Sequence, residues 1–345
     1  MSTALTYLAS NRRRLGLDRY GVGDDPAWVA ITPRFRASSH VIVLVLAEGS
    51  LTPALAVKMA RLPGDGASLD REAAILHTVQ AGRPAGYDSI PRVVAYDCYL
   101  GHPILVETAL AGEPMAAPAV RRDQTACCEA ALSWLIEVQS APLCSADPRW
   151  FTRLVEAPLR RLSDALGPSP AEERLLADTW SYAEALREAA IPLVCEHGDL
   201  SHPNVLLTGA GRVSVLDWET AELAGLPACD LFFFLTYIAF ARRARWGRQG
   251  HVEAFHEAFF GPRAWARPYV ERYARQIGVP AAALTPLLVL TWARYLAGLL
   301  GRLGEGGNAP DDGTTAAWLR GNRYFALWRH AVADAGSLVW NLNAH

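Results

Sequence analysis

The chain contains 345 residues, of which 51% are hydrophobic and 20% are charged, as in ordinary folded globular proteins. At ~150 residues per domain, this length predicts two domains or one two-lobed domain. The formal net charge is -2, whereas a general nucleic-acid-binding protein usually carries a strong basic excess, so we expect no nucleic-acid partner.

The N-terminal segment gives no sign of a secretory signal, because no basic stretch is followed by an apolar core. Residues 1–25 are polar and end in a Gly-Val-Gly-Asp-Asp sequence that predicts a loop. The longest apolar runs, 41–47 and 231–235, are shorter than the ~18 residues that a membrane span requires. We therefore expect a cytoplasmic protein without a membrane partner.

Short runs rich in β-branched residues and bounded by turn residues predict strands in the first third of the chain. These runs are residues 28–32, 40–47, 54–60, 90–99 and 103–110. Between the third and the fourth run, residues 69–80 carry apolar side chains at helical spacing and predict a helix. Residues 1–110 are therefore expected to form an N-terminal lobe with an antiparallel sheet and one helix.

Residues 111–119 contain two prolines and many small residues, which predicts a linker. Most of the following chain, residues 120–345, has helical periodicity and predicts a helical C-terminal lobe. The predicted helices are 120–141, 170–190, 228–245, 251–260, 264–277, 281–303 and 314–335. In the segment 191–217, short apolar runs alternate with turn residues and predict two small strands. The predicted fold class is α+β with two lobes.

The densest cluster of polar residues in the second half has the form His-x-Asp-x-x-x-x-Asn, running from His197 to Asn204. A β-turn-β and a further aspartate, Asp217, follow it, and this order is typical of kinase-type phosphoryl-transfer enzymes. Such chemistry needs one carboxylate at the acceptor hydroxyl, and an amide with a second carboxylate that hold Mg²⁺ against the phosphates. We interpret Asp199 as the first group and Asn204 with Asp217 as the metal ligands.

Lys58 is the only lysine among 33 basic residues, and all the others are arginines. A coding bias toward arginine explains the other 32 but not the exception. An ammonium on a flexible stem is a different chemical group from a planar guanidinium. The retained lysine therefore indicates a functional position.

The segments His197-Gly198-Asp199-Leu200 through Asn204 and Leu216-Asp217-Trp218-Glu219 resemble the aminoglycoside phosphotransferase and choline kinase family. The resemblance covers roughly residues 25 to 300. It implies a two-lobed, protein-kinase-like fold that moves the terminal phosphate of ATP or GTP to a hydroxyl of a small molecule, with Mg²⁺. It also implies that Glu219 adds a metal ligand.

In the first lobe, the resemblance implies that Lys58 binds the nucleotide and that Glu72, which opens the following helix, pairs with it. It places Glu107 and Ala109 at the nucleotide-binding hinge between the lobes. Kinases often cover the phosphates with a glycine-rich loop, but the corresponding segment 33–40 has no glycine. Ser38 and Ser39, with their backbone N–H groups, are the expected phosphate contacts there.

Two other functions compete with that of a small-molecule kinase. A protein kinase needs a long activation segment, and only 13 residues separate Asp217 from Asp230. In protein kinases, an arginine before the catalytic aspartate binds the phosphorylated activation loop, and Gly198 stands at that position here. A catalytically silent, kinase-like nucleotide-binding protein remains the alternative, because the phosphate loop lacks glycine.

The acceptor is expected to bind in the helical half of the chain. Candidate segments are 232–248, which is rich in arginine, and Trp292-Ala293-Arg294-Tyr295. The predicted helices contain no concentrated acidic tract that would suit a polyamine antibiotic. A neutral or anionic acceptor, such as a sugar, a nucleoside or a nucleoside-like antibiotic, is therefore preferred over a polycationic aminoglycoside.

Overall fold

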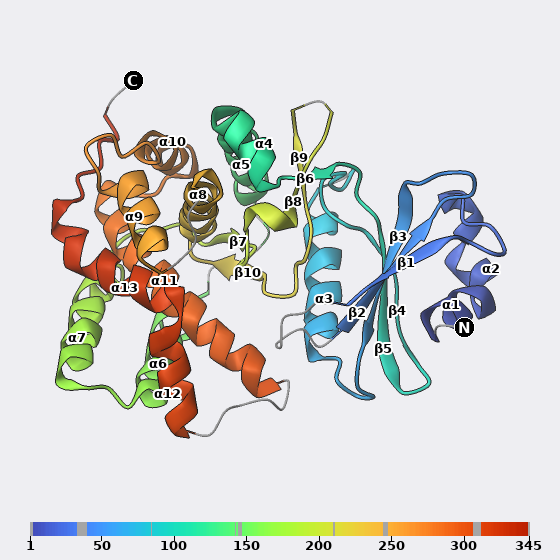
Figure 1. Cartoon of the computed structure of the whole chain (residues 1–345), viewed down its shortest axis with the longest axis horizontal. Helices are drawn as coiled ribbons and strands as arrows, with labels where there is room; N and C mark the ends of the chain where they lie inside the picture. Colours follow the sequence, from blue (N-terminus) through green and yellow to red (C-terminus); the bar gives the residue numbers. More distant parts are fainter. Residues whose placement is uncertain are drawn as a thin grey trace. The chain divides into compact units, whose positions relative to one another are not determined.

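The computed structural model describes residues 3–32, 40–83, 85–141, 143, 147–209, 211–243, 248–305 and 312–343. Its contacts divide the chain into two compact units, which are described separately (Figure 1). Unit 1 combines Met1–Pro114 with Asn204–Ala221, and unit 2 combines Met115–Pro203 with Glu222–His345. The segment Asn204–Ala221 therefore packs with the N-terminal unit, whereas the sequence analysis placed it in the C-terminal lobe.

Unit 1 is built on a five-stranded antiparallel sheet in the order β1-β2-β3-β5-β4. The strands are β1 (Trp28–Ile31), β2 (His40–Leu46), β3 (Pro53–Ala60), β4 (Val93–Tyr99) and β5 (His102–Thr108). Each predicted strand is present, because its β-branched residues suit a pleated, buried surface. A smaller sheet contains β6 (Glu113–Pro114), β8 (Val205–Leu207) and β9 (Val213–Val215).

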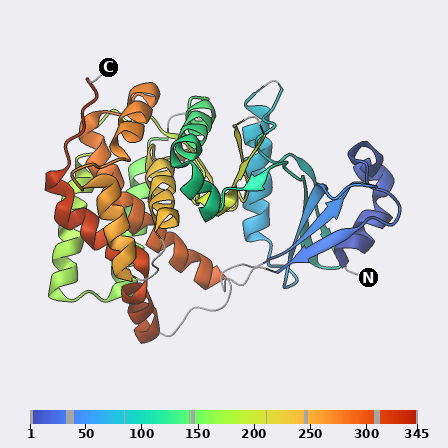
Figure 2. The same cartoon turned by 45° about the horizontal axis from the view of Figure 1, so that its top comes forward.

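Helices cover both faces of the five-stranded sheet (Figures 1 and 2). On one face, α1 (Thr3–Ser10), α2 (Arg12–Leu15) and the 3₁₀ turn η1 (Leu17–Tyr20) contribute to a core with β2, β3 and β5. On the other face, α3 (Ala67–Ala81) packs through Leu69 and Ala73. The loop predicted for the Gly-Val-Gly-Asp-Asp sequence at residues 21–25 is present, but the helices that precede it were not predicted. Tyr7, Leu8 and Leu15 are buried, and Ala4, Tyr7 and Leu8 already had helical spacing.

Side chains alternate between the two faces along each strand, and this alternation determines which polar side chains face α3. In β3, Leu55 and Val57 face the core with α1 and α2, whereas Ala60 packs with α3. Lys58 shares the parity of Ala60, so its side chain is directed to the α3 side. Glu107 of β5 shares the parity of Leu105, which also packs with α3.

Unit 2 is mainly helical, as predicted. Its helices are α4 (Ala117–Arg122), α5 (Gln124–Gln139), α6 (Ala157–Leu166), α7 (Pro170–Glu184), α8 (Cys229–Arg242), α9 (Arg248–Phe259), α10 (Arg267–Ile277), α11 (Ala281–Glu305), α12 (Asp312–Gly321) and α13 (Arg323–Asp334). Shorter elements are the π-helical turn η2 (Thr152–Glu156), the 3₁₀ turns η3 (His202–Asn204) and η4 (Ala335–Ser337), and the paired strands β7 (Val194–Glu196) and β10 (Glu222–Gly225). Helix α6 was not predicted, although Leu159, Leu162 and Leu166 form its buried face.

The segment Ala281–Arg302 of α11 is the one stretch among the described residues that is long and apolar enough to cross a membrane. In the structure, 72% of its most apolar window is buried. Leu287, Leu290 and Trp292 are fully covered by neighbouring elements. The apolar composition of α11 is therefore accounted for by its place in the core of unit 2.

Candidate active site

The Lys58 ammonium of β3 is buried in unit 1 and lies against α3. Its Nζ atom is 2.5 Å from Oε1 of Glu72, which is itself fully buried. The same Glu72 oxygen accepts a hydrogen bond from the backbone N–H of Trp218 at 2.9 Å. The carboxylate thus fixes the position of the ammonium, and the segment after β9 fixes the carboxylate.

Two more carboxylates surround the ammonium. Oε1 of Glu107 lies 3.5 Å and Oδ1 of Asp217 lies 3.8 Å from Nζ of Lys58. Burial lowers the pKa of Lys58, but the carboxylates of Glu107, Glu72 and Asp217 outweigh that effect and raise it above its ordinary value. The lysine is therefore charged throughout the physiological pH range.

Burial raises the pKa of Glu72, and it raises the pKa of Glu107 to about 8, while the Lys58 ammonium opposes both shifts. Oε2 of each glutamate is buried and accepts no hydrogen bond from the described part of the chain. The raised pKa values mean that the two buried glutamates do not both carry a full negative charge at pH 7. The oxygen atoms of Asp217 and Asn204 are of the kind that a hard divalent cation such as Mg²⁺ prefers.

The positions of the predicted metal ligands follow from the β8–β9 hairpin. The carbonyl of Asn204 accepts a hydrogen bond from Leu216 N at 2.9 Å, so both ends of the hairpin are held together. Asp217 has a left-handed backbone with φ 67°, which is rare for a residue other than glycine and is typical of functional positions. Oε2 of Glu219 lies 3.9 Å from Nδ1 of His40.

The sequence analysis gave His40 no role of its own. This residue begins β2 and is buried beside the Lys58 cluster. Burial and the nearby Lys58 charge lower the pKa of His40 to about 4, so its imidazole is neutral at pH 7. The one feature of the sequence that could have indicated a role for His40 is its position at the end of the predicted phosphate loop, residues 33–40.

Four other residues assigned to nucleotide binding have different outcomes. Ser38 and Ser39 lie outside the described residues. Ala109 follows β5, and its N–H donates to the carbonyl of Ala54 at 3.0 Å. Glu107 lies inside strand β5 with its side chain against Lys58, so its carboxylate belongs to the lysine cluster.

Asp199 lies in unit 2, in the loop that follows β7. Tyr295 of α11 donates a hydrogen bond to Oδ1 of Asp199 at 3.3 Å, and Nη1 of Arg302 lies 3.9 Å from Oδ2. The Asp199 N–H donates to Nδ1 of His197 at 3.3 Å. His197 therefore contributes a structural contact within this loop.

The carboxylate of Asp230, the second residue of α8, binds the backbone of the loop that carries Asp199. This carboxylate accepts hydrogen bonds from the backbone N–H groups of His197 (2.7 Å) and Gly198 (2.9 Å) and from Nε2 of Gln139 (3.1 Å). Burial raises the pKa of Asp230 to about 7, and these backbone donors oppose the shift. Asp230 therefore positions the loop that presents Asp199.

Next to Asp199, unit 2 carries a group that we call the acceptor cluster. Its members are Tyr237, Tyr295, Arg302, Arg323 and Tyr324. Nη2 of Arg323 donates to Oη of Tyr237 at 2.7 Å and to Oη of Tyr324 at 2.8 Å. The rings of Tyr324 and Tyr295 have centroids 4.6 Å apart, and the Arg302 guanidinium lies 5.6 Å from the centroid of Tyr295.

Burial and neighbouring groups determine the protonation states of the side chains in the acceptor cluster. Burial raises the pKa of Tyr237 and Tyr295 well above their ordinary value, so both phenols are neutral at pH 7. Burial lowers the pKa of Arg323, but Tyr324 and Tyr237 outweigh this and raise it. Beside Asp199, the cluster therefore presents the neutral hydroxyl groups of Tyr237 and Tyr295 and the positive guanidinium group of Arg323.

The two segments expected to bind the acceptor are only partly represented in this cluster. Tyr295 belongs to it, but Arg294 is engaged by the buried Glu196 through hydrogen bonds of 2.8 Å and 3.0 Å. Trp292 is fully buried. In the arginine-rich stretch, Arg243 pairs with acidic residues of α9, and residues 244–247 lie outside the described residues. Arg323 was missed, because nothing in the sequence of α13 distinguishes it from a surface arginine.

Comparisons with known proteins agree with this arrangement. The structure resembles a choline kinase from Streptococcus pneumoniae, with 11% identity, TM-score 0.54 and coverage of 94% of this chain and 99% of that chain. It resembles an ethanolamine kinase from Plasmodium vivax, with 10% identity, TM-score 0.54 and coverage of 96% and 88%. It also resembles an aminoglycoside phosphotransferase in a ternary complex with ADP and hygromycin B, with 15% identity, TM-score 0.51 and coverage of 93% and 98%.

At these identities the structural likeness shows the kinase-like fold alone. A comparison with curated proteins found no match. The sequence profile of the phosphotransferase enzyme family matches residues 37–269, which is more than half of the chain. The matched range includes Lys58, Asp199 and Asp217. The chain belongs to the phosphotransferase enzyme family.

Proposed function

We propose that this protein transfers the terminal phosphate of ATP or GTP to a hydroxyl group of a small molecule, with Mg²⁺ as the metal. The observation that carries the proposal is the buried Lys58 ammonium, held 2.5 Å from Glu72 with Asp217 at 3.8 Å. An ammonium fixed in this way supplies charge to the phosphates of a bound nucleotide. The phosphotransferase of similar fold that was solved with ADP supports a nucleotide co-substrate.

Each predicted residue has a defined task in this reaction. Asn204 and Asp217 would hold Mg²⁺, with Glu219 as a further oxygen ligand, and the ion would supply positive charge against the phosphates. Asp199 orients the acceptor hydroxyl and takes its proton. The acceptor oxygen bonds to the terminal phosphorus, the bond from that phosphorus to the bridging oxygen breaks, and the nucleoside diphosphate leaves.

We further propose a neutral or anionic acceptor, such as a sugar, a nucleoside or a nucleoside-like antibiotic. The acceptor cluster next to Asp199 supports this, because its two charged members, Arg302 and Arg323, are both cationic. A polycationic aminoglycoside would meet like charges there, which is costly where charges are partly desolvated. Aromatic rings in the same cluster suit the flat face of a base or a sugar.

The test is a screen with labelled ATP and labelled GTP in the presence of Mg²⁺. Sugars, nucleosides and nucleoside-like antibiotics are offered as acceptors, and aminoglycosides serve as the polycationic contrast. We expect Mg²⁺-dependent labelling of a neutral or anionic hydroxyl compound. Labelling of aminoglycosides alone would contradict the acceptor class but support the reaction.

Asp199→Asn provides the matched catalytic control, because the change keeps the size and removes the charge. We expect turnover to fall ~10²–10⁴-fold, as is typical for general acid–base groups, with nucleotide binding retained. Asp178→Asn, an exposed position on α7, should retain wild-type turnover. Near-normal turnover of Asp199→Asn would refute its role. Nucleotide binding without transfer or hydrolysis in the wild-type protein would favour a catalytically silent binding protein.

A further inference from the structure

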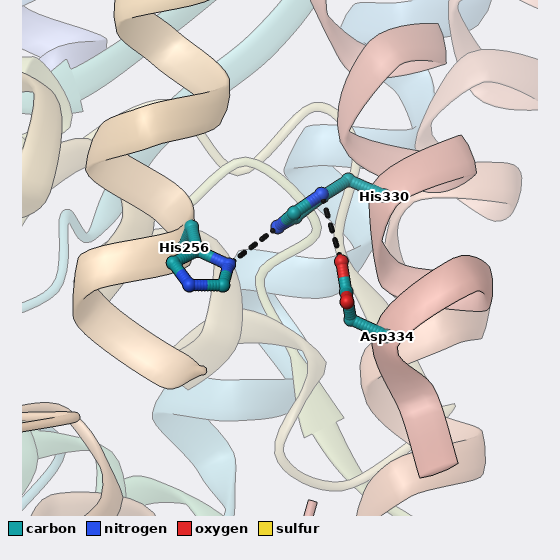
Figure 3. Close-up of side chains that lie close together, drawn as sticks. All are labelled: His256, His330 and Asp334. Atoms are coloured by element: carbon teal, nitrogen blue, oxygen red, sulfur yellow. Dashed lines mark hydrogen bonds and ion pairs between the residues drawn. The ribbon is translucent and has the colours of Figure 1, made fainter. Parts of the chain in front are cut away.

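A cluster of metal-ligating side chains lies in unit 2 between α9 and α13, outside the residues assigned to phosphoryl transfer (Figure 3). Nδ1 of His256 lies 3.1 Å from Nε2 of His330. The other ring nitrogen of His330, Nδ1, lies 3.0 Å from Oδ2 of Asp334, one turn later on the same helix. All three side chains are half-buried.

The carboxylate decides which nitrogen of His330 is available. With Oδ2 of Asp334 3.0 Å from Nδ1, the carboxylate favours the neutral tautomer that has its proton on Nδ1 and its free lone pair on Nε2. That lone pair is directed at His256, which approaches from α9 (Figure 3). Metal-binding histidines commonly have this arrangement, in which a carboxylate holds the distal N–H and orients the ligand nitrogen.

The spacing of the two facing nitrogens is also suitable. A tetrahedral Zn²⁺ ion with Zn–N bonds of about 2.0–2.1 Å holds two imidazole nitrogens roughly 3.3 Å apart. The observed separation of 3.1 Å is close to this distance, and both rings must turn so that their lone pairs meet at the ion. His256 would carry its proton on Nε2 when Nδ1 binds the ion, so the imidazole stays neutral.

We propose that His256 and His330 bind a divalent transition-metal ion of the Zn²⁺ class, and that Asp334 positions His330 for this task. Imidazole nitrogen favours Zn²⁺, Ni²⁺ and Cu²⁺ over Mg²⁺, which prefers oxygen ligands. Water completes the coordination, since two protein nitrogens leave positions open. The bound ion joins α9 to the last part of α13, the helix that begins with Arg323 and Tyr324 of the acceptor cluster.

The site is tested by titrating the metal-free, full-length protein with Zn²⁺ in a calorimeter, with Mg²⁺ in a parallel titration. Wild-type protein is expected to bind Zn²⁺ at this site. His256→Gln and His330→Gln are expected to weaken that binding at least tenfold. Asp334→Asn should weaken it about 10-fold or more, as for other carboxylates that orient a metal-binding histidine.

His77→Gln is the matched control, because His77 is exposed on α3 of unit 1, and its Zn²⁺ affinity should equal that of wild type. Absence of Zn²⁺ binding in wild type, or equal affinity in wild type and both histidine variants, would overturn the proposal. Should the variants fail to fold, hydrogen exchange of the wild-type protein decides. Zn²⁺ but not Mg²⁺ must slow exchange in α9 and α13, and unchanged exchange there refutes the site.

Discussion

At the scale of single residues, Lys58 is the most constrained side chain of the candidate active site. It is 4% exposed and is enclosed by carboxylates on β5, on α3 and after β9. An ammonium fits this space as a compact point charge, whereas a guanidinium is planar and needs several partners in fixed directions. A substitution that preserves charge therefore changes the geometry.

Lys58→Arg is expected to reduce kcat/KM for the nucleotide by about 100-fold, because the larger group displaces the carboxylates and misplaces the phosphates. Steady-state kinetics with varied nucleotide measures this effect. Arg92→Lys, which alters an exposed arginine paired with Asp88, serves as the control and should leave kcat/KM unchanged. A fully active Lys58→Arg protein would contradict the assigned role.

Glu107 predicts a pH dependence of stability. Its folded-state pKa of about 8 exceeds its ordinary value of 4.5, mainly because of burial. Between these two pH values the folded protein binds more protons than the unfolded chain, so the free energy of unfolding falls as pH rises, by about 1.4 kcal/mol per pH unit for one group. The stabilising contribution is complete below pH 4.5 and is lost above pH 8.

Glu107→Gln removes this group, so the loss of stability between pH 5 and pH 8 should be smaller in the variant than in wild type. Urea unfolding without nucleotide, at several pH values, measures the difference. Glu173→Gln, at an exposed position of α7, should follow the wild-type curve. Parallel curves for wild type and Glu107→Gln would show that Glu107 is ionised throughout.

The sequence predicted part of this site well. The unusual Lys58 and the spacing from His197 to Asp217 could be recognised without a structure, because each stands out in a local pattern. The proximity of Glu107 to Lys58 could not, since it depends on the register between β3 and β5, which places Lys58 opposite Leu105. His40 and Arg323 were missed because their partners come from elements that are distant in the sequence.

At the scale of secondary-structure elements, prediction succeeded where periodicity was strong. Each of the five predicted strands of the main sheet is present, and α11 begins at residue 281 as expected. Helices α1 and α2 were missed because Arg12, Arg13 and Arg14 made the segment look polar, although α1 buries Ala4, Tyr7 and Leu8. This short segment is helical because its apolar side chains bury the face of the five-stranded sheet that α3 leaves open.

Helix α13 presents a testable element of acceptor recognition. Asn322 caps its N-terminus by accepting a hydrogen bond from Tyr324 N at 3.1 Å, which fixes the first turn that carries Arg323. Arg323→Gln should raise KM for an anionic acceptor ~10-fold or more, the usual effect of losing a charged hydrogen bond, and leave KM for the nucleotide unchanged.

Two further variants separate charge from packing in α13. Arg323→Lys keeps the charge and should retain part of the acceptor affinity. Arg329→Gln changes an exposed arginine on the same helix and should behave as wild type. An increase of both KM values, or equal losses in Arg323→Gln and Arg329→Gln, would indicate that Arg323 stabilises the fold and does not bind the acceptor.

At the scale of the whole molecule, the chain builds unit 1 from two separate segments. Residues 1–114 supply Lys58, Glu72 and Glu107, but Asp217 and Trp218 come from residues 204–221. A division by composition could not reveal this, because the second segment is short and is flanked on both sides by helical sequence. Its place is fixed by pairing of β6 with β8 and by the hydrogen bond from Trp218 N to Glu72.

This organisation predicts how unit 1 behaves when isolated. Strands β6 and β8 are antiparallel, with Pro114 opposite Leu206, so the two segments can be joined by a short glycine-containing turn that replaces residues 115–203. The joined protein, residues 1–114 and 204–221, should unfold cooperatively and retain weak Mg²⁺-dependent nucleotide binding. It should lack phosphoryl transfer, because Asp199 is absent.

Residues 1–114 alone are expected to be much less stable, because Glu72 loses its Trp218 donor and β6 loses its partner strand. Glu72 keeps its Lys58 partner, but losing a hydrogen bond to a charged group costs about 1.5–3 kcal/mol, a considerable part of the roughly 5–15 kcal/mol that is typical of a whole domain. Urea unfolding and nucleotide titration of the two proteins measure the difference. Equal cooperativity and equal nucleotide binding would show that residues 204–221 are dispensable for unit 1, and the magnesium ligands would then have to be sought among residues 1–114.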